Sequence, residues 1–180
     1  MSTRKRDIFE LFNCFFITTT FNDWLKLLLE DKYYFEIIHS IDFCLKKYKA
    51  DLIAYVLMPN HIHLILFYNG KTEVSGFMRD FKKYTSTRIR QLLEEDGKTK
   101  ILERLRYNIN RQKFKVWKDR FDAVIIRHKN VLITKIKYIH NNPVKYGLVE
   151  REEEWKYSSS SFYKTGKQGV LSIKHAGEII

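Results

Sequence analysis

Short apolar runs in the first part of the chain predict strands, with a stretch of helical spacing between them. Residues 12–21 hold four phenylalanines and three consecutive threonines, which are strand formers, and they predict a first strand. Residues 50–57 and 61–68 are two more apolar runs on either side of a Pro-Asn turn signal. Between the first strand and residues 50–57, a helix is expected to begin at Asp31, a candidate cap. Its apolar stripe is Tyr34, Ile37, Ile38, Ile41, Leu45 and Tyr48.

The order strand, helix, strand, strand is the opening of a ferredoxin-like, or RRM-like, unit. We therefore expect an α+β fold in which helices pack on an antiparallel sheet. A second helix is expected over residues 73–93, and residues 94–114 are charged and irregular and are interpreted as an insertion. The stripe of that second helix is Val74, Phe77, Met78, Phe81, Thr85, Arg88 and Leu92.

The last third of the chain predicts one strand and one helix. The strand is expected over residues 122–127 and the helix over residues 129–141, where Pro143 should end it because proline lacks an amide hydrogen. Residues 164–180 are interpreted as a polar C-terminal tail. At 180 residues, with no internal repeat, the chain is expected to form a single domain spanning residues 1–180.

The charge of the chain indicates a polyanionic partner. Lys and Arg outnumber Asp and Glu by 33 to 21, which gives a net charge of +12 and a pI near 9.6. Charge alone does not separate DNA from RNA or from an anionic membrane. No apolar run is long enough to cross a bilayer and no signal-peptide cleavage pattern is present, so a cytoplasmic location is expected. Two cysteines without Cys-x-x-Cys spacing indicate neither a disulfide framework nor a zinc knuckle.

Two histidines in the third expected strand are candidate metal ligands. Side chains alternate between the faces of a strand, so His61 and His63 share a face and Ile62 points to the other. Neutral imidazole is a common ligand for divalent metals, and two on one face can bind the same ion. A pair of structural histidines is the more frequent explanation of His-x-His on its own, so the pattern needs partners elsewhere in the chain.

The expected helix at residues 129–141 carries a second group of polar residues. Leu132, Ile136 and Ile139 form its core stripe. Tyr138 and Asn142 lie one turn apart on a different edge, beside Lys135, so the tyrosine is free of packing duty.

Five motifs in order resemble the HUH single-tyrosine transposases, most closely the REP-associated tyrosine transposases and their relatives. The resemblance runs from Phe15 to about Phe162. The motifs are Met58-Pro59-Asn60-His61-Ile62-His63, Phe81-Lys82-Lys83-Tyr84-Thr85, Trp117-Lys118-Asp119-Arg120-Phe121, Tyr138 to Pro143 with Gly147, and Trp155 with Ser158-Ser159.

This resemblance implies the HUH endonuclease fold and a metal-dependent reaction on DNA. Mg²⁺ or Mn²⁺ would be held by His61, His63 and Asn142, where many relatives have Gln in place of the asparagine. Tyr138 would cut single-stranded DNA beside a hairpin, REP-like or from a transposon end, and form a 5′-phosphotyrosine link that allows strand transfer. A homodimer is compatible with the resemblance. Candidate DNA-binding residues are Lys82, Lys83, Arg79, Lys135 and Lys145.

Two other classes of function compete with this interpretation. A non-catalytic, domesticated nucleic-acid-binding module of the same fold would leave His61, His63 and Tyr138 without a role. A metal-dependent hydrolase that uses water would need the clusters of Asp or Glu that the sequence lacks. Within the favoured class, Tyr84 is a second candidate nucleophile. It is disfavoured because Arg88, one turn on, is a cation and cannot bind a metal.

Overall fold

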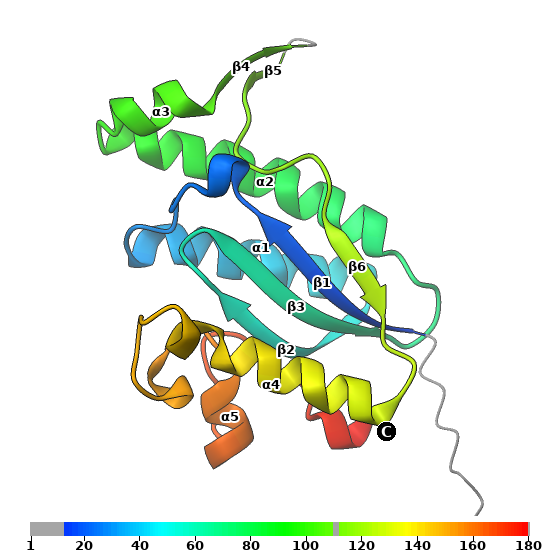
Figure 1. Ribbon diagram of the computed structural model, residues 1–180. Helices are drawn as coiled ribbons and strands as arrows, with labels where there is room; N and C mark the ends of the chain where they lie inside the picture. Colours follow the sequence, from blue (N-terminus) through cyan, green and yellow to red (C-terminus); the bar gives the residue numbers. More distant parts are fainter. Residues whose placement is uncertain (1–12, 110–111, 180) are drawn as a thin grey trace, which may run out of the picture.

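The computed structural model describes residues 13–109 and 112–179, and Figure 1 shows the order of the elements. The strands are β1 (Cys14–Thr20), β2 (Ala50–Leu57), β3 (His61–Tyr68), β4 (Arg106–Ile109), β5 (Gln112–Phe114) and β6 (Asp122–Ile125). The α-helices are α1 (Asp31–Tyr48), α2 (Val74–Glu95), α3 (Thr99–Leu105), α4 (Lys129–Lys145) and α5 (Ser160–Thr165). Three short 3₁₀ turns are η1 (Asn22–Trp24), η2 (Glu152–Glu154) and η3 (Ala176–Glu178).

The main sheet has four antiparallel strands in the order β2-β3-β1-β6. β1 pairs with β3 along its whole length, from Cys14 opposite Phe67 to Thr20 opposite His61. β2 pairs with the other edge of β3, so β1 and β2 run parallel to each other with β3 between them. This is the ferredoxin-like arrangement, and the α+β class predicted from the sequence is confirmed.

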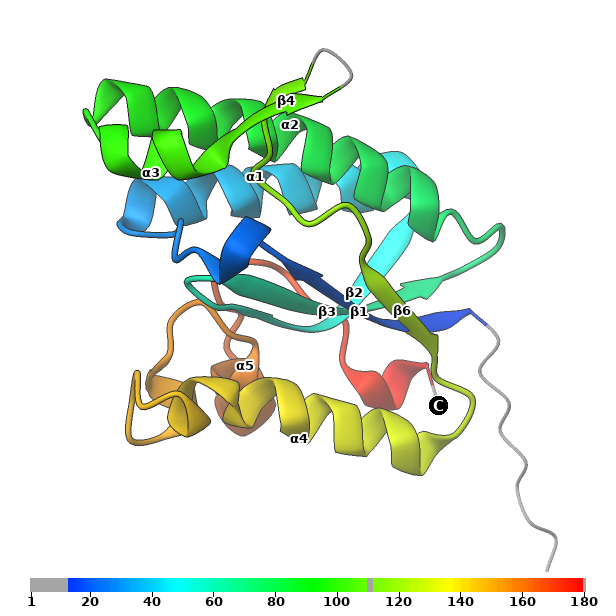
Figure 2. The ribbon, with the colours of Figure 1, turned by 45° about the horizontal axis from the view of Figure 1, so that its top comes forward.

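Helices cover both faces of the sheet (Figure 2). On the face toward α1 and α2, the core includes Ile62, Leu64 and Leu66 of β3. On the opposite face, which α4 covers, the core includes Ile65 of β3 together with Leu132, Ile136 and Ile139 of α4. The strand alternation therefore places the side chains of His61 and His63 under α4, and the predicted sharing of one face is confirmed.

The predicted second helix is α2, with one change in its buried stripe. Ile89, and not Arg88, occupies the buried position. Arg88 is instead paired with Glu36 of α1, with 2.8 Å between its Nη2 and the carboxylate. At the edge of the core, between α1 and α2, the Arg88 guanidinium keeps Glu36 as its ion-pair partner. In the core interior it would be a buried charge without a partner.

The described residues of the predicted insertion, 94–109 and 112–114, form regular secondary structure. They form the end of α2, the helix α3 and a hairpin of β4 and β5 that extends beside α2 (Figure 1). Leu105 is fully buried and anchors this segment to the core. The segment is mostly charged, and its few inward-facing apolar residues are too sparse to form a recognisable pattern in the sequence.

Helix α4 continues past Asn141 through Pro143 to Lys145, so the predicted end at Pro143 is wrong. A proline near the end of a helix removes only one hydrogen bond, and here the following turn is well closed. The amide of Leu148 donates to the carbonyl of Pro143, and that of Gly147 donates to the carbonyl of Val144. With Gly147 at φ 66°, this is a Schellman motif, which requires the left-handed conformation that glycine adopts without strain.

The cap predicted at Asp31 is also wrong. The residue before α1 is Glu30, and Asp31 lies in the first turn without capping it. The Asp31 carboxylate instead accepts hydrogen bonds from Tyr157 Oη and Lys156 Nζ, both at 2.6 Å. It thus ties the start of α1 to the segment that follows α4.

The closing motif of the chain is bound to the β2 edge. Trp155 Nε1 donates to the carbonyl of Leu57, and the Tyr55 amide donates to Ser159 Oγ. The segment predicted as a polar tail, residues 164–180, is likewise part of the fold, because Leu171, Ile173 and Ala176 are buried. The amide of Lys174 donates to the carbonyl of Leu52, so this segment follows the same edge.

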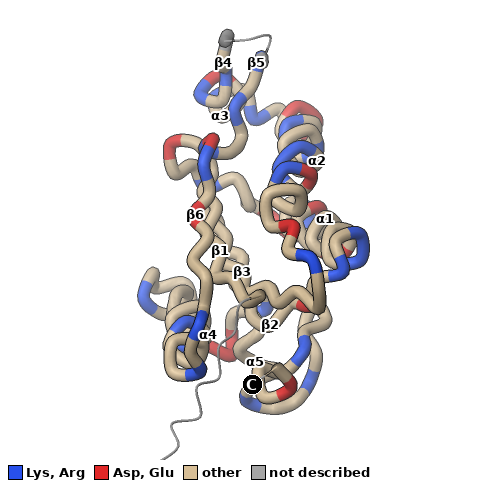
Figure 3. Tube along the Cα trace, turned by 90° about the vertical axis from the view of Figure 1, so that its right-hand side faces the viewer, with Lys and Arg blue, Asp and Glu red and all other residues tan. Residues whose placement is uncertain are grey.

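The charged residues lie on the outer elements. Figure 3 shows Lys and Arg gathered on α2, on α4 and on the segment from α3 to β5, while the central strands carry few charged residues. In residues 13–109 and 112–179, no helix combines the length and apolar character needed to cross a bilayer.

The C-terminal segment offers a direct test of its packing. Leu171→Ala should lower the free energy of unfolding by roughly 2–5 kcal/mol, because it removes a side chain that is only 3% exposed. Val170→Ala, at a neighbour that is 41% exposed, should change it by less than about 0.5 kcal/mol. Urea unfolding measures both, and equal stability of the two variants would contradict the packing of this segment.

Candidate active site

His61 and His63 form a buried pair at the start of β3. Their ring centroids are 4.9 Å apart, and the two residues are 4% and 3% exposed. The ring of His63 stacks on Phe16 of β1, with 5.3 Å between centroids. The rings are therefore held in place by the sheet and not by a flexible loop.

Each histidine has a partner on its Nδ1 atom. His63 Nδ1 lies 2.8 Å from Thr18 Oγ1, which faces it across β1, and His61 Nδ1 lies 2.7 Å from Asn60 Oδ1. A Nδ1–H that donates to these oxygens leaves Nε2 unprotonated on both rings, the arrangement that usually orients metal-binding histidines. His63 Nε2 is buried and has no hydrogen-bond partner within the described residues.

Both rings are held neutral by their surroundings. Burial, together with smaller effects of the nearby His61 and Lys135, lowers the pKa of His63 to about 3. Burial also lowers the pKa of His61, although a hydrogen bond with Asn142 works against this. Neutral imidazole is the form that binds metal ions, so the pair is ready for an ion at neutral pH.

Tyr138 of α4 lies beside this pair. Its ring centroid is 5.3 Å from that of His63 and 6.0 Å from that of Phe16, both in edge-on contacts. The residue is 46% exposed, whereas Ile136 and Ile139 on either side of it are buried. The prediction that Tyr138 stands outside the core stripe is confirmed.

Asn142 connects the tyrosine to the histidine pair. Its Nδ2 donates to the carbonyl of Tyr138 at 2.8 Å, and its side chain lies close enough to His61 to oppose the lowering of that residue's pKa. At 3% exposed, it is far more buried than a position on the free edge of a helix would be. The amide is thus fixed between the two parts of the site.

These three residues fit a divalent ion. Two imidazole nitrogens and an amide oxygen are neutral metal ligands. The buried Nε2 of His63 has no hydrogen-bond partner among the described residues, so its lone pair is available to a metal ion. The described residues hold no group of three or more His, Cys, Asp or Glu side chains that could form an acidic metal site. Coordination by His61, His63 and Asn142 would leave positions open for substrate oxygens.

Two aromatic residues near the site were missed by the sequence analysis. Trp24 of η1 is 54% exposed, and its ring lies 6.2 Å from that of His61. Tyr146, which follows α4, is exposed with its ring 5.7 Å from that of His61. Tyr146 could have been found from its offset of eight residues, about two helical turns, from Tyr138. Trp24 gives no such signal, because only the fold brings the end of β1 beside β3.

Of the predicted DNA-binding residues, two lie close to the tyrosine. Lys135 Nζ is 4.4 Å from the Phe16 ring centroid and 5.8 Å from that of Tyr138. Lys145 lines a shallow depression on α4 together with Tyr138 and Asn142.

The three candidates on α2 lie on the other face of the sheet. Lys82 is bound internally, because its Nζ donates to the carbonyls of Lys118, Asp119 and Arg120. Burial lowers the pKa of its amine to about 8. Arg79 is exposed and paired with Asp80, while Lys83 is exposed. This geometry gives Lys82 a structural role and leaves Lys83 and Arg79 at the surface, away from the histidines.

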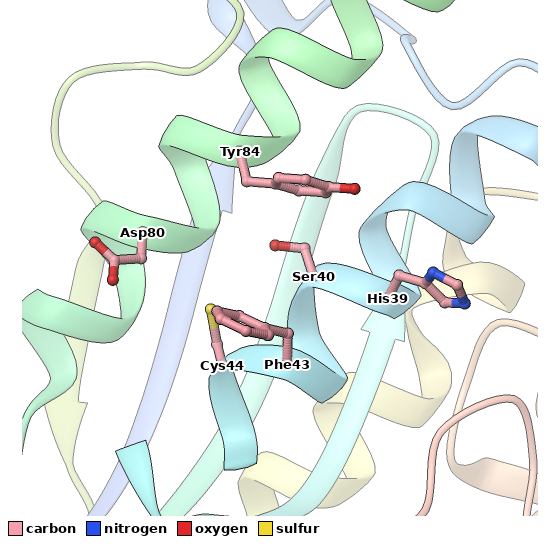
Figure 4. Close-up of a pocket in the computed structure, with 6 residues that line it drawn as sticks. All are labelled: His39, Ser40, Phe43, Cys44, Asp80 and Tyr84. Carbon is pink, nitrogen blue, oxygen red and sulfur yellow. The ribbon is translucent and has the colours of Figure 1, made fainter. Parts of the chain in front are cut away.

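Tyr84, the rival nucleophile, also lies on the far face of the sheet. Its hydroxyl donates to Glu36 at 3.3 Å, and it borders a cavity of about 300 Å³ between α1 and α2. Figure 4 shows Tyr84 of α2 above Ser40 and Phe43 of α1 in this cavity. The sheet separates it from His61 and His63.

Comparisons with known proteins agree with this arrangement. A family model described as "Transposase IS200 like" matches residues 25–142. A protein of Haemophilus influenzae described as a REP-associated tyrosine transposase is 31% identical over 188 residues, which cover 99% of this chain and 100% of the relative. The REP-associated tyrosine transposase of Escherichia coli is 26% identical over 130 residues, 72% of this chain and 64% of its own length.

The fold is shared with a solved structure as well. The structure of a REP-associated tyrosine transposase bound to a REP hairpin has a TM-score of 0.64 and 22% identity, and the match covers 97% of this chain and 92% of that one. The chain therefore belongs to the IS200-like family of single-tyrosine transposases, together with the REP-associated tyrosine transposases.

A third buried histidine predicts how stability depends on pH. His140 Nε2 lies 2.9 Å from Ser159 Oγ, and burial lowers the pKa of His140 to about 4. The unfolded chain, with a pKa near 6.5, binds the proton first, so stability is full above pH 6.5 and falls between pH 6.5 and 4. His140 should account for a loss of about 2 kcal/mol between pH 7 and pH 5.

His140→Gln should remove that loss. Urea unfolding of the metal-free protein at the two pH values would measure it, with wild type as reference. If the variant lost as much stability in acid as wild type, His140 would have to titrate normally in the folded protein.

Proposed function

We propose that this protein cleaves single-stranded DNA beside a hairpin and transfers the cut strand through a covalent link to Tyr138. The observation that carries this proposal is the position of Tyr138, exposed and 5.3 Å from the ring of His63, whose buried Nε2 lacks a partner. A nucleophile next to a ready metal ligand fits attack on a phosphate.

The chain's own residues have distinct parts in this reaction. The Tyr138 oxygen attacks phosphorus, the bond from phosphorus to the 3′ oxygen breaks, and the products are a 5′-phosphotyrosine and a 3′-hydroxyl. The phenol proton passes to solvent, and the 3′ oxygen takes a proton as it leaves. Lys135, whose Nζ lies 5.8 Å from the Tyr138 ring centroid, supplies positive charge beside the tyrosine. A divalent ion held by His61, His63 and Asn142 would polarise the phosphate and stabilise negative charge in the transition state.

The donor set favours Mn²⁺ over Mg²⁺ in this site. Mg²⁺ prefers carboxylate and water oxygens, whereas two of the three donors here are imidazole nitrogens. Mg²⁺ would also bind, at a higher concentration than Mn²⁺, because it would take oxygen ligands from the amide of Asn142, from the substrate phosphate and from water.

Hairpin-associated single strands are the proposed substrate. Support comes from the relatives named as REP-associated tyrosine transposases and from the net charge of +12. Trp24 adds a feature of this chain, since an exposed indole beside the histidines can stack on an unpaired base.

The proposed metal site can be tested in the absence of DNA, by substituting a ligand or the residue that orients it. Thr18→Val removes the hydroxyl beside His63 Nδ1 and should weaken Mn²⁺ binding by roughly 10- to 100-fold. His63→Gln should weaken it further, because it replaces an imidazole ligand with an amide. Isothermal titration of the metal-free proteins measures both, and His140→Gln, a buried histidine outside the site, serves as control. Unchanged Mn²⁺ affinity in His63→Gln, with the fold verified by circular dichroism, would refute the metal site.

The nucleophile is tested with three tyrosines. Stem-loop DNA with randomised single-stranded flanks is incubated with Mn²⁺, and protein linked to DNA is separated on a denaturing gel. Tyr138→Phe should form no adduct, because only the attacking hydroxyl is lost, and should bind the DNA normally. Tyr146→Phe and Tyr84→Phe should retain the adduct, the first because its ring lies beside His61 and not His63, the second because it is on the other face of the sheet.

Each outcome of this experiment decides between alternatives. If the DNA of the adduct were attached to Tyr146, about two helical turns after Tyr138, the assignment of the nucleophile to Tyr138 would be overturned. Absence of any adduct in wild type, with binding intact, would favour the non-catalytic binding module.

A further inference from the structure

A groove separates α2 from the β4–β5 hairpin, on the side of the molecule away from the histidines. Lys83 and Arg90 of α2 line one wall, and Lys113 and Phe114 of β5 line the other, around a volume of about 580 Å³. We call this the hairpin groove. Two of its lining residues, Lys113 and Phe114, belong to the segment whose fold the sequence did not reveal.

The hairpin groove lies in the most basic part of the chain. Residues 98–120 contain nine Lys and Arg and only two acidic residues, a net charge of +7 out of +12 for the whole chain. Lys83 and Lys113 are exposed, and neither has a carboxylate within ion-pair distance in the described part of the chain. Arg90 shares its charge with Glu94.

The groove is suited to phosphates and not to bases. The ring of Phe114 is covered by the Arg90 guanidinium at 5.6 Å, and the ring of Tyr107 by Lys115 Nζ at 4.7 Å. The aromatic faces that would stack on unpaired bases are thus occupied by cations. Trp24 also has a lysine over its ring, Lys118 at 4.3 Å, but at 54% exposed it is more accessible to a base than the half-buried Phe114 and Tyr107. The groove instead offers positive charge that matches the phosphates of a duplex.

The chain directly after β5 is tied to α2 by hydrogen bonds, so the groove exists before DNA arrives. Lys82 binds the carbonyls of residues 118–120, and Trp117 Nε1 donates to Thr85 Oγ1 of α2 at 2.9 Å. The indole of Trp117 also stacks on Phe21, with 4.0 Å between ring centroids. A preformed groove loses little conformational freedom on binding.

The segment that follows the hairpin connects the groove to the active site. Lys118 Nζ lies 4.3 Å from the Trp24 ring centroid, and the Trp24 ring is 6.2 Å from that of His61. The five residue-to-residue steps from Lys113 to Lys118 span at most about 17 Å. One strand of a duplex rises 3.4 Å per nucleotide, so this distance corresponds to roughly five base steps.

We propose that the hairpin groove binds the phosphate backbone of the duplex stem that adjoins the cut strand, through Lys83, Arg90 and Lys113. This inference rests on the proposed function, because it assigns the groove to the same DNA substrate. Trp24 and the histidines receive the unpaired strand, and the groove holds the stem a few base steps away. Binding through phosphates does not depend on sequence, so any stem serves as a probe.

The test uses the full chain with both groove lysines neutralised, Lys83→Gln with Lys113→Gln. The control pair, Lys46→Gln with Lys71→Gln, removes the same charge from two exposed lysines at the end of the molecule opposite His61. Fluorescence anisotropy gives the affinity for a stem-loop with a single-stranded flank and for the same flank without the stem. The dependence of each affinity on salt is measured between roughly 50 and 200 mM.

The groove variant should bind the stem-loop roughly tenfold more weakly, and the slope of its log affinity against log salt should fall by about two. Its affinity for the flank alone should match wild type within about twofold, and the control pair should behave as wild type on both probes. Equal losses on both probes, or no loss on the stem-loop, would overturn the proposal.

Adduct formation separates this inference from the proposed function. Wild type that forms an adduct, with a groove variant that binds the stem-loop normally, refutes the groove alone. Wild type that forms no adduct, with a groove variant that loses only stem binding, refutes the cleavage reaction and supports the groove.

Discussion

The pairing of β1 with β3 is the constraint on which the site depends. Its register sets Thr18 opposite His63 and Thr20 opposite His61. A slip of one residue would turn every side chain of β3 to the other face and bury both imidazoles against α1 and α2. The apolar residues on both faces oppose that slip, since Ile62 and Leu64 fit one core and Ile65 the other. The geometry of the histidines is thus fixed by packing energy spread over the whole strand.

The second requirement is that α4 lies on the face of the sheet that carries the histidines. Its three buried residues, Leu132, Ile136 and Ile139, seat it on the sheet, and the same periodicity directs Tyr138 to the rim. Asn142 then falls inside, between the Tyr138 carbonyl and His61. A helix with its apolar stripe rotated by one residue would keep its stability but would separate the tyrosine from the metal ligands.

The sequence predicted the elements whose patterns are local and failed where a residue's role depends on distant neighbours. Alternation placed His61 and His63 on one face, and helical spacing set Tyr138 apart from the core. Nothing local shows that Trp24 meets His61, or that the Lys82 amine is used by three backbone carbonyls. The fold of this segment was missed for a related reason, since Leu105 is the one fully buried residue among those of 94–114 whose burial the structure describes. Pro143 misled because the rule against proline is weakest in the last turn of a helix.

In the proposed reaction, the packing of α4 on the sheet also determines what can move after the cut. Lifting this helix from the sheet would expose Leu132, Ile136 and Ile139, at roughly 1.5–3 kcal/mol for each side chain, or about 5–9 kcal/mol in all. A 5′ end linked to Tyr138 would therefore keep its position, because α4 stays on the sheet. The free 3′ end would travel instead, and the reach of the flexible DNA between stem and cut would limit where the ends can be rejoined.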